Sequence, residues 1–263
     1  MSTTTTAPGQ TRTAHPRPLT DISAMVGREA RRTLRSVDSL VTSLLIPVSI
    51  MVVFVVVFGG AIQGDGDYVG YVVPGTILLC AGFGAATTAV PVAQDQTSGT
   101  IARLKTLPVY GPAVLVGHVV ASVVRNLVST TFVVAVAVAL GFRPGANALG
   151  WVAVVLFLVL AVTALTWIAC AAGLVLSVEA AGALSFVALF LPYLSSGFVP
   201  VETLPSWLHG FATHQPSTPI IETLRALLDG TDPTGTLLPA LVWLVGLGTV
   251  GFLASTSLHR RRA

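Results

Sequence analysis

Charged residues are scarce in this chain. Asp, Glu, Lys and Arg together make up 10% of its 263 residues, whereas ordinary soluble domains contain about 25%. Lysine is almost absent, because Lys105 is the only one and it follows Leu104. A Walker A loop needs Gly-Lys-Ser/Thr to hold nucleotide phosphates. This chain therefore cannot supply a standard P-loop, and ATP hydrolysis, if it drives the protein, must come from another subunit.

Recognisable catalytic and metal-binding motifs are also missing. The sequence has no G-x-S-x-G, no H-E-x-x-H and no paired His/Cys cluster. Its two cysteines, Cys80 and Cys170, lie inside apolar runs, and they match neither a disulfide framework nor a metal spacing. A net charge of +3 is too small to suggest a nucleic-acid partner. We expect no catalytic residue, no metal and no cofactor bound by this chain itself.

Long apolar runs are abundant instead. Hydrophobic residues make up 53% of the chain, and its mean hydropathy is +0.83. A helix of about 20 apolar residues crosses a hydrocarbon core about 30 Å thick, and six runs are long enough: 40–62, 71–92, 113–140, 149–176, 181–199 and 236–257. The sequence predicts an all-α, polytopic membrane protein with six transmembrane helices in residues 39–263. No Asp or Glu lies in these runs, which argues against an ion-coupled carrier.

Positive charge is distributed unevenly among the connecting segments. Eleven Lys and Arg residues precede the first run, follow the second or follow the last, and only Arg143 and Arg225 lie in the opposite loops. Basic loops remain in the cytoplasm. With an even number of spans, both termini are predicted to be cytoplasmic. The excess of Arg over Lys, with abundant Ala, Val and Gly, indicates a bacterial protein, so we expect a multi-pass protein of the cytoplasmic (inner) membrane.

The segment before the first run has two parts. Residues 1–18 are rich in Thr and Pro and predict a disordered tail. On a helix over 19–38, apolar side chains gather on one side and four arginines on the other: Arg28, Arg31, Arg32 and Arg35. This pattern predicts an amphipathic interfacial helix whose arginines face lipid headgroups, the alternative being a solvated helix.

The inner loop 94–112 can form a short amphipathic helix. Ser98 or Thr100 can cap it, Ile101, Leu104 and Leu107 share one face, and Pro108 ends it. Such a helix could be a surface turn. It is also the form of a coupling helix that docks in a groove on a cytoplasmic motor domain.

The outer segment 200–235 predicts a re-entrant or interfacial helical hairpin between the fifth and sixth spans. Its two amphipathic stretches are too short to cross the membrane. In the second, Thr218 is the predicted N-cap, Pro219 the first helical residue and Gly230 the stop. Glu202 and Glu222 are interpreted as solvated carboxylates, with the reception of a cationic substrate as the alternative.

Polar residues in the spans allow two interpretations. Arg125 in the third span either snorkels to the inner interface, which we favour, or interacts inside the subunit or with a partner. We interpret His118 as an interfacial polar residue rather than a ligand. Thr87, Thr88, Asn126, Thr130, Thr163, Thr166 and Tyr193 could line a transport path, although hydrogen bonds between helices or to their own backbone are favoured.

Three stretches together carry a family resemblance. The inner loop has an acidic-x-x-x-Gly-Thr-x-x-x-Leu-x-x-x-Pro pattern at Asp95, Gly99, Thr100, Leu104 and Pro108, and the third span contributes Gly117, Arg125 and Asn126. The outer hairpin contributes Glu202, Pro205, Trp207, Pro216, Pro219, Glu222 and Arg225. This combination resembles the membrane subunit of a type 2 ABC exporter, closest to the daunorubicin-resistance permease group. The chain departs from that group where Gln94 and Gln96 flank Asp95.

The resemblance implies a permease without an ATPase motif of its own. It implies two permease subunits, expected to form a homodimer with a heterodimer as the alternative, and two cytoplasmic nucleotide-binding subunits that hold ATP and Mg. Asp95, Gly99, Thr100, Ile101, Leu104 and Pro108 would couple ATP hydrolysis to export of an amphipathic drug, lipid or glycan precursor. The alternatives are an ion-coupled secondary transporter, a channel or sensor subunit, and an intramembrane enzyme.

Overall fold

The computed structural model describes residues 18–35, 37–58, 68–105 and 112–261, and within them every regular element is a helix. The chain starts with α1 (Pro18–Arg35) and α2 (Val37–Val53), which continues into the π-helical turn η1 (Phe54–Phe58). Next come α4 (Tyr68–Ala86), α5 (Ala89–Thr97), α6 (Thr100–Lys105), α7 (Ala113–Ala139) and α8 (Ala148–Gly173). The last part contains α9 (Val178–Phe190), the 3-10 turns η2 (Leu191–Leu194) and η3 (Val201–Thr203), α10 (Ser206–His214), α11 (Ser217–Asp229) and α12 (Thr234–Arg261).

Four helical stretches are long and apolar enough to cross a membrane. They are Tyr68–Thr97, which joins α4 and α5, and the helices α7, α8 and α12. Two shorter apolar stretches, Leu44–Val57 and Val178–Leu194, fall on the predicted first and fifth spans. Helices satisfy their own backbone groups, as lipid requires. The all-helical polytopic prediction is thus confirmed, while the number of crossings and the orientation stay predictions.

The rod formed by α4 and α5 is interrupted by a turn at Thr87 and Thr88. Pro91, which follows in the first turn of α5, has no N–H to donate to the Thr87 carbonyl. Beyond the turn, the helical stretch continues to Thr97 and includes Asp95, which is 6% exposed. The predicted span 71–92 itself holds no carboxylate, and Asp95 lies on the helical extension beyond its end.

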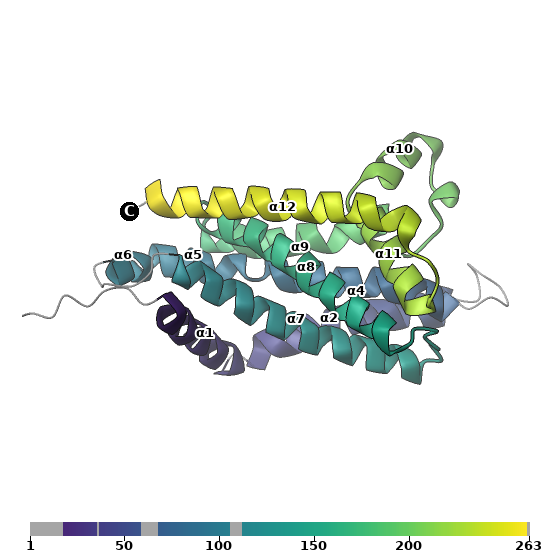
Figure 1. Ribbon diagram of the computed structural model, residues 1–263, viewed down its shortest axis with the longest axis horizontal. Coiled ribbons are helices and arrows are strands. Elements are labelled where there is room, and N and C mark those ends of the chain that lie inside the picture. The colour runs from purple at the N-terminus through teal and green to yellow at the C-terminus, as the bar shows by residue number, and fades with distance from the viewer. Residues whose placement is uncertain (1–17, 36, 59–67, 106–111, 262–263) are drawn as a thin grey trace, which may run out of the picture.

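Helix α4 lies in the middle of the bundle, in contact with α2, α7, α8, α9 and α11 (Figure 1). Its side chains are buried on nearly all sides, and they form the main core with residues of α7, α8, α11 and α12. A Cβ atom added at Gly75 would lie 2.3 Å from the carbonyl oxygen of Gly197. Glycine at this position lets α4 touch the backbone of the segment after η2.

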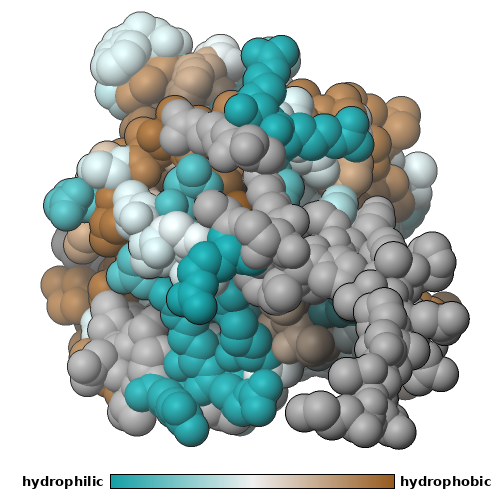
Figure 2. Space-filling view, turned by 90° about the vertical axis from the view of Figure 1, so that its left-hand side faces the viewer, coloured by the Kyte–Doolittle hydropathy of each residue, from teal (hydrophilic) through white to brown (hydrophobic). Residues whose placement is uncertain are grey.

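The two ends of the bundle differ in character. Helices α1, α5 and α6 and the end of α12 lie at one end, and α10 and α11 lie at the other (Figure 1). Hydrophilic side chains gather on the first end, and apolar side chains lie around its edges (Figure 2). The predicted N-terminal helix, inner loop and C-terminus therefore share one end, as the predicted topology requires.

Helix α11 begins earlier than the sequence pattern predicts. Its first residue is Ser217 and its N-cap is Pro216, so Thr218 is inside the helix and is not the cap. The Thr218 hydroxyl instead donates a hydrogen bond to the carbonyl of Ala212 in α10. The predicted stop is confirmed, since Gly230 caps the C-terminus with a φ of 71°.

Candidate functional site

A buried cluster of ionisable side chains joins α1, α5 and α7. Nδ1 of His118 on α7 lies 3.3 Å from Oε2 of Glu29, and its Nε2 lies 3.2 Å from Oδ2 of Asp95. All three residues are buried, with exposures of 2%, 5% and 6% for His118, Glu29 and Asp95. A protonated imidazole can donate to both carboxylates, because each ring nitrogen then carries a hydrogen. His118 therefore binds two other helices from inside the protein and is not an interfacial residue.

Two arginines of α1 complete this cluster. Arg28 donates to Asp95 and lies 2.9 Å from Oε1 of Glu29, and Nη1 of Arg32 lies 3.2 Å from Oδ1 of Asp95. Burial alone would raise the pKa of Glu29, but the hydrogen bond with His118 and the charges of His118 and Arg28 outweigh it and lower the pKa. The two carboxylates thus remain ionised within an ion-pair network.

The same three residues could also be considered as metal ligands. One ligand atom each from Glu29, Asp95 and His118 lie within 4.8 Å of one another. A cation there would have to displace Arg28 and Arg32, which already neutralise Asp95. The donor set is therefore accounted for as an ion-pair network.

Helix α1 packs along α7, and this contact changes the interpretation of its arginines. A Cβ added at Gly117 of α7 would come within 3.0 Å of the Met25 side chain, so the two helices lie close together. Arg28 and Arg32 turn toward Asp95, whereas Arg31 and Arg35 are exposed. Arg28 and Arg32 thus have carboxylate partners within the protein, a role that the sequence did not predict, while the contact of the four arginines with lipid headgroups stays a prediction.

A second polar network lies where α4 ends. Nη2 of Arg125 donates to the carbonyl of Gly84 at 2.8 Å and to the hydroxyl of Thr88 at 3.0 Å. Thr88 in turn donates to Ser122 at 3.1 Å, and Ser122 lies 3.0 Å from the hydroxyl of Thr166 on α8. Arg125 thus interacts inside the subunit, and the favoured snorkelling interpretation is not what the structure contains.

Asn126 takes part in the same helix contact. Its Nδ2 donates to the carbonyl of Ser122 at 2.9 Å, and a Cβ on Gly84 would lie 2.2 Å from its Oδ1. Thr87, Thr88, Asn126 and Thr166 therefore form hydrogen bonds between helices or to the backbone. This agrees with the interpretation favoured for them over a transport path.

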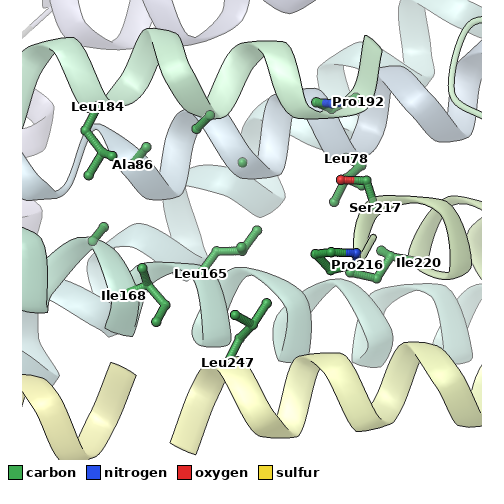
Figure 3. Close-up of a pocket in the computed structure, with 13 residues that line it drawn as sticks. Leu78, Ala86, Leu165, Ile168, Leu184, Pro192, Pro216, Ser217, Ile220 and Leu247 are labelled. Carbon is green, nitrogen blue, oxygen red and sulfur yellow. The ribbon is translucent and has the colours of Figure 1, made fainter. Parts of the chain in front are cut away.

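An apolar pocket of about 230 Å³ lies between α4, α8, α9, α11 and α12 (Figure 3). Leu78 and Ala86 come from α4, Leu165 and Ile168 from α8, and Leu184 from α9, and all five lie around the same space. The N-terminus of α11 closes one end with Pro216, Ser217 and Ile220. Hydrocarbon cavities of about 150 Å³ bind an aromatic ring the size of benzene, so this pocket can hold a comparable apolar group.

Arg225 fastens α11 to the centre of the bundle. Its Nη2 donates to the carbonyls of Tyr71 and Ser196 at 3.1 and 2.9 Å, and its guanidinium lies 4.2 Å above the Tyr71 ring. Its Nη1 donates to Glu222 at 2.7 Å. Glu222 is therefore paired with Arg225 while its side chain stays 34% exposed, and Glu202 on η3 is exposed.

The two halves of the outer hairpin differ in burial. In α11, Pro219 is buried with the apolar face formed by Ile220, Ile221 and Leu224. In α10, Trp207 is 78% exposed, and Pro205 just before the helix is exposed as well. The helix α10 projects from the bundle beside α11 (Figure 1). Only α11 thus belongs to the packed core.

The inner loop is described as far as Lys105, so Leu107 and Pro108 lie outside the described residues. Gly99 adopts a φ of 71° between α5 and α6, and Thr100 begins α6. Ile101 is 4% exposed and packs with Val92, Leu115 and Trp167. Ile101 therefore anchors α6 to its own chain and does not lie on an open docking face.

Comparison with known proteins decides the family. The sequence profile of the ABC-2 type transporter family matches residues 20–228. The chain belongs to the ABC-2 type transporter family. It is 28% identical over 227 residues to a probable doxorubicin resistance ABC transporter permease protein, DrrC, of Mycobacterium tuberculosis, which covers 83% of this chain and 80% of the relative. It is also 28% identical over 226 residues to the daunorubicin resistance ABC transporter permease protein DrrB1 of Streptomyces coeruleorubidus, covering 85% and 79%.

The family match confirms the resemblance drawn from sequence motifs, and it covers α1 through most of α11. An ABC-2 permease is a membrane component that works with an ABC ATPase subunit. Sequence reasoning placed Asp95 in this ABC-2 chain's coupling loop but missed its partners Glu29 and His118. A signal was present, because Glu29 follows Met25 by four residues and so lies on the apolar stripe of α1.

Proposed function

We propose that this chain is the transmembrane subunit of an ATP-driven exporter of an amphipathic molecule. The observation that carries the proposal is the ABC-2 family match over residues 20–228. Its relatives are named for resistance to doxorubicin and daunorubicin, so a drug with an apolar ring system is the first substrate class to test. Two copies of the chain work with two copies of a separate ATPase subunit, both termini being cytoplasmic.

The charge cluster supports a route for coupling. Asp95 lies near the end of α5, directly before the loop that leads to α6, and it is held by two arginines of α1 and by His118 of α7. A displacement of α6 by the ATPase subunit moves α5, and the ion pairs transmit this movement to α1 and α7. Helices α1, α5, α6 and α7 then move as one unit when the ATPase subunit changes conformation.

The apolar pocket supports a place for the substrate's hydrocarbon part. It is lined by α4, α8, α9, α11 and α12. Helix α11, at the pocket's end, is held in place by Arg225. A relative movement of α9 and α4 would change the pocket's size, and release on the outer side would follow.

Transport in inverted membrane vesicles tests this function. Vesicles that contain the chain with its ATPase subunit should accumulate doxorubicin when ATP is added, and an ionophore that collapses the proton gradient should not prevent it. Leu104→Glu places a charge on α6, the element proposed to contact the ATPase subunit, and should abolish accumulation while the protein stays in the membrane. Normal accumulation by this variant would contradict docking through α6.

The pocket has a matched pair of variants on α9. Ala188 lines the pocket, whereas Ala183 on the same helix is exposed. Ala188→Leu fills the space, so the apolar part of the substrate can no longer be buried there. Burial of a leucine-sized group contributes about 1.5–3 kcal/mol, so the rate of doxorubicin accumulation should fall about tenfold. Ala183→Leu should leave the rate unchanged. Equal rates for both variants would remove the pocket from the transport path.

One specific observation favours a second candidate, a proton-coupled carrier. A buried histidine between two carboxylates is the kind of group that proton-coupled carriers use to take up and release protons. Under that alternative, accumulation would continue without ATP and stop with the ionophore. The vesicle experiment separates the two functions directly.

A further inference from the structure

A polar pocket of about 340 Å³ lies beside the charge cluster, between α1, the turn that separates α4 from α5, and α7. Its wall includes the polar side chains Glu29, Arg32, Thr87, Thr88, His118 and Arg125. It is separate from the apolar pocket, with which it shares no lining residue. A polar space among apolar helices can hold water or a polar ligand.

Arg125 offers this pocket an unused hydrogen-bond donor. Its Nη2 is occupied by Gly84, Thr87 and Thr88. Its Nε is fully buried and has no hydrogen-bond partner in the described part of the chain. A guanidinium has five N–H donors and binds flat oxyanions with two of them at once. The Nε–H that the described helices leave without a partner therefore suits an acceptor oxygen of a ligand.

The charges around the pocket are not balanced without such a ligand. Glu29 and Asp95 carry two negative charges, and Arg28 and Arg32 already pair with them. No carboxylate of the described residues forms an ion pair with Arg125. The net charge around the pocket is therefore positive even when His118 is neutral. The C-terminal end of α4 offsets about half a charge. A positive charge remains, and buried charges in proteins normally have a partner.

We propose that this pocket binds an oxyanion, with Arg125 as its principal ligand. The ligand chemistry is a phosphate group, which a lipid headgroup or free phosphate can supply. Basic pockets between membrane helices bind anionic headgroups in this way. Arg31 and Arg35 are exposed on the same helix that forms one wall, and they attract an anionic surface to the pocket's edge.

Lipid selectivity of the full chain tests the proposal. The chain is placed in phosphatidylcholine nanodiscs that contain a small fraction of spin-labelled phosphatidylglycerol or spin-labelled phosphatidylcholine, and the immobilised fraction of each label is measured. The wild type should prefer phosphatidylglycerol, and Arg125→Gln should lower this preference about fivefold, the size expected for one basic residue at an anionic lipid. Arg143→Gln makes the same change just beyond the other end of α7 and should leave the preference unchanged.

A second measurement keeps Arg125 intact and covers the case in which Arg125→Gln fails to fold. Ala121 lines the pocket, and Ala121→Cys places a thiol there, while the native Cys80 and Cys170 are buried. Alkylation by a neutral maleimide should be slower in nanodiscs with phosphatidylglycerol than in pure phosphatidylcholine. Slower alkylation on addition of inorganic phosphate alone would identify the free ion as the source.

The outcomes separate clearly. A lipid preference that depends on Arg125, or protection of the Ala121→Cys thiol by phosphatidylglycerol or phosphate, supports the oxyanion site. If neither anion slows alkylation, and any lipid preference is the same with Arg125→Gln, the proposal is overturned. Neither measurement requires transport, so its result is independent of the exporter function.

Discussion

Nε2 of His118 on α7 lies 3.2 Å from Oδ2 of Asp95 on α5. Helix α6 follows shortly after Asp95 in the chain, and α7 begins shortly before His118, so this contact joins the helices on either side of the inner loop. Arg28 and Arg32 add α1 to the same carboxylate. A force applied to α6 therefore acts on three helices.

His118→Ala should destabilise the protein. The variant leaves two buried carboxylates without the imidazole, and an unsatisfied buried group costs about 1–3 kcal/mol. We expect a lower Tm in detergent solution. His214→Ala, on the exposed surface of α10, is the control and should change the Tm little. Equal shifts for both variants would contradict a structural role for the His118 contacts.

Stability should fall in acid because of Glu29. The pKa of Glu29 is lower in the folded protein than its usual value, so its contribution is full above the unfolded pKa of about 4.3 and is lost as the pH falls through the folded pKa. The Tm of the wild type should therefore drop below about pH 4.

Glu29→Gln is the matched test of this acid sensitivity. The variant keeps the shape but not the charge, so its Tm should already be lower at neutral pH and should fall less steeply in acid than the wild type's Tm. Parallel pH profiles for the two proteins would show that Glu29 is not the titrating group.

Gly75→Ala should lower stability through a backbone clash. The new Cβ would lie 2.3 Å from the carbonyl oxygen of Gly197, and overpacking of this kind costs about 1–3 kcal/mol. Gly82→Ala makes the same substitution in α4 with the nearest neighbour at 3.8 Å, the carbonyl oxygen of Ala188. It should be neutral or stabilising, because alanine is the better helix former. A similar Tm for the two variants would rule out the close contact between α4 and Gly197.

Arg225→Lys should loosen α11 from the bundle. A lysine ammonium cannot reproduce the two hydrogen bonds to Tyr71 and Ser196, the pair with Glu222 and the stacking on Tyr71 at once. The expected loss is about 1–3 kcal/mol in unfolding free energy.

Hydrogen exchange can locate the effect of this substitution. Backbone amides of α11 should exchange faster in Arg225→Lys than in the wild type, while amides of α7 should be unaffected. Arg143→Lys, an exposed arginine that bonds only to nearby carbonyls in the described structure, is the control. Unchanged exchange in α11 would contradict the anchoring role.

Local patterns in the sequence were enough to predict the helices and the protein family. Apolar runs of membrane-crossing length predict helices, because lipid offers no partner for free backbone groups. The stop of α11 at Gly230 was predicted because a left-handed residue favours glycine. The start of α11 was missed, because Thr218 found a partner in α10 instead of capping its own helix.

The sequence by itself determined the membrane class, the lack of a P-loop and the segments that identify an ABC-2 permease, since each depends on composition or on residues close together in the chain. Only the tertiary structure decided the partners of the ionisable residues. Asp95, Glu29, Arg125 and His118 come from three separate helices, and no spacing in the chain reveals which of them meet. The free-energy cost of burying a charge in an apolar bundle depends on these tertiary contacts. They place the ion-pair network of His118 beside Arg125, which forms no ion pair with a carboxylate of the described residues.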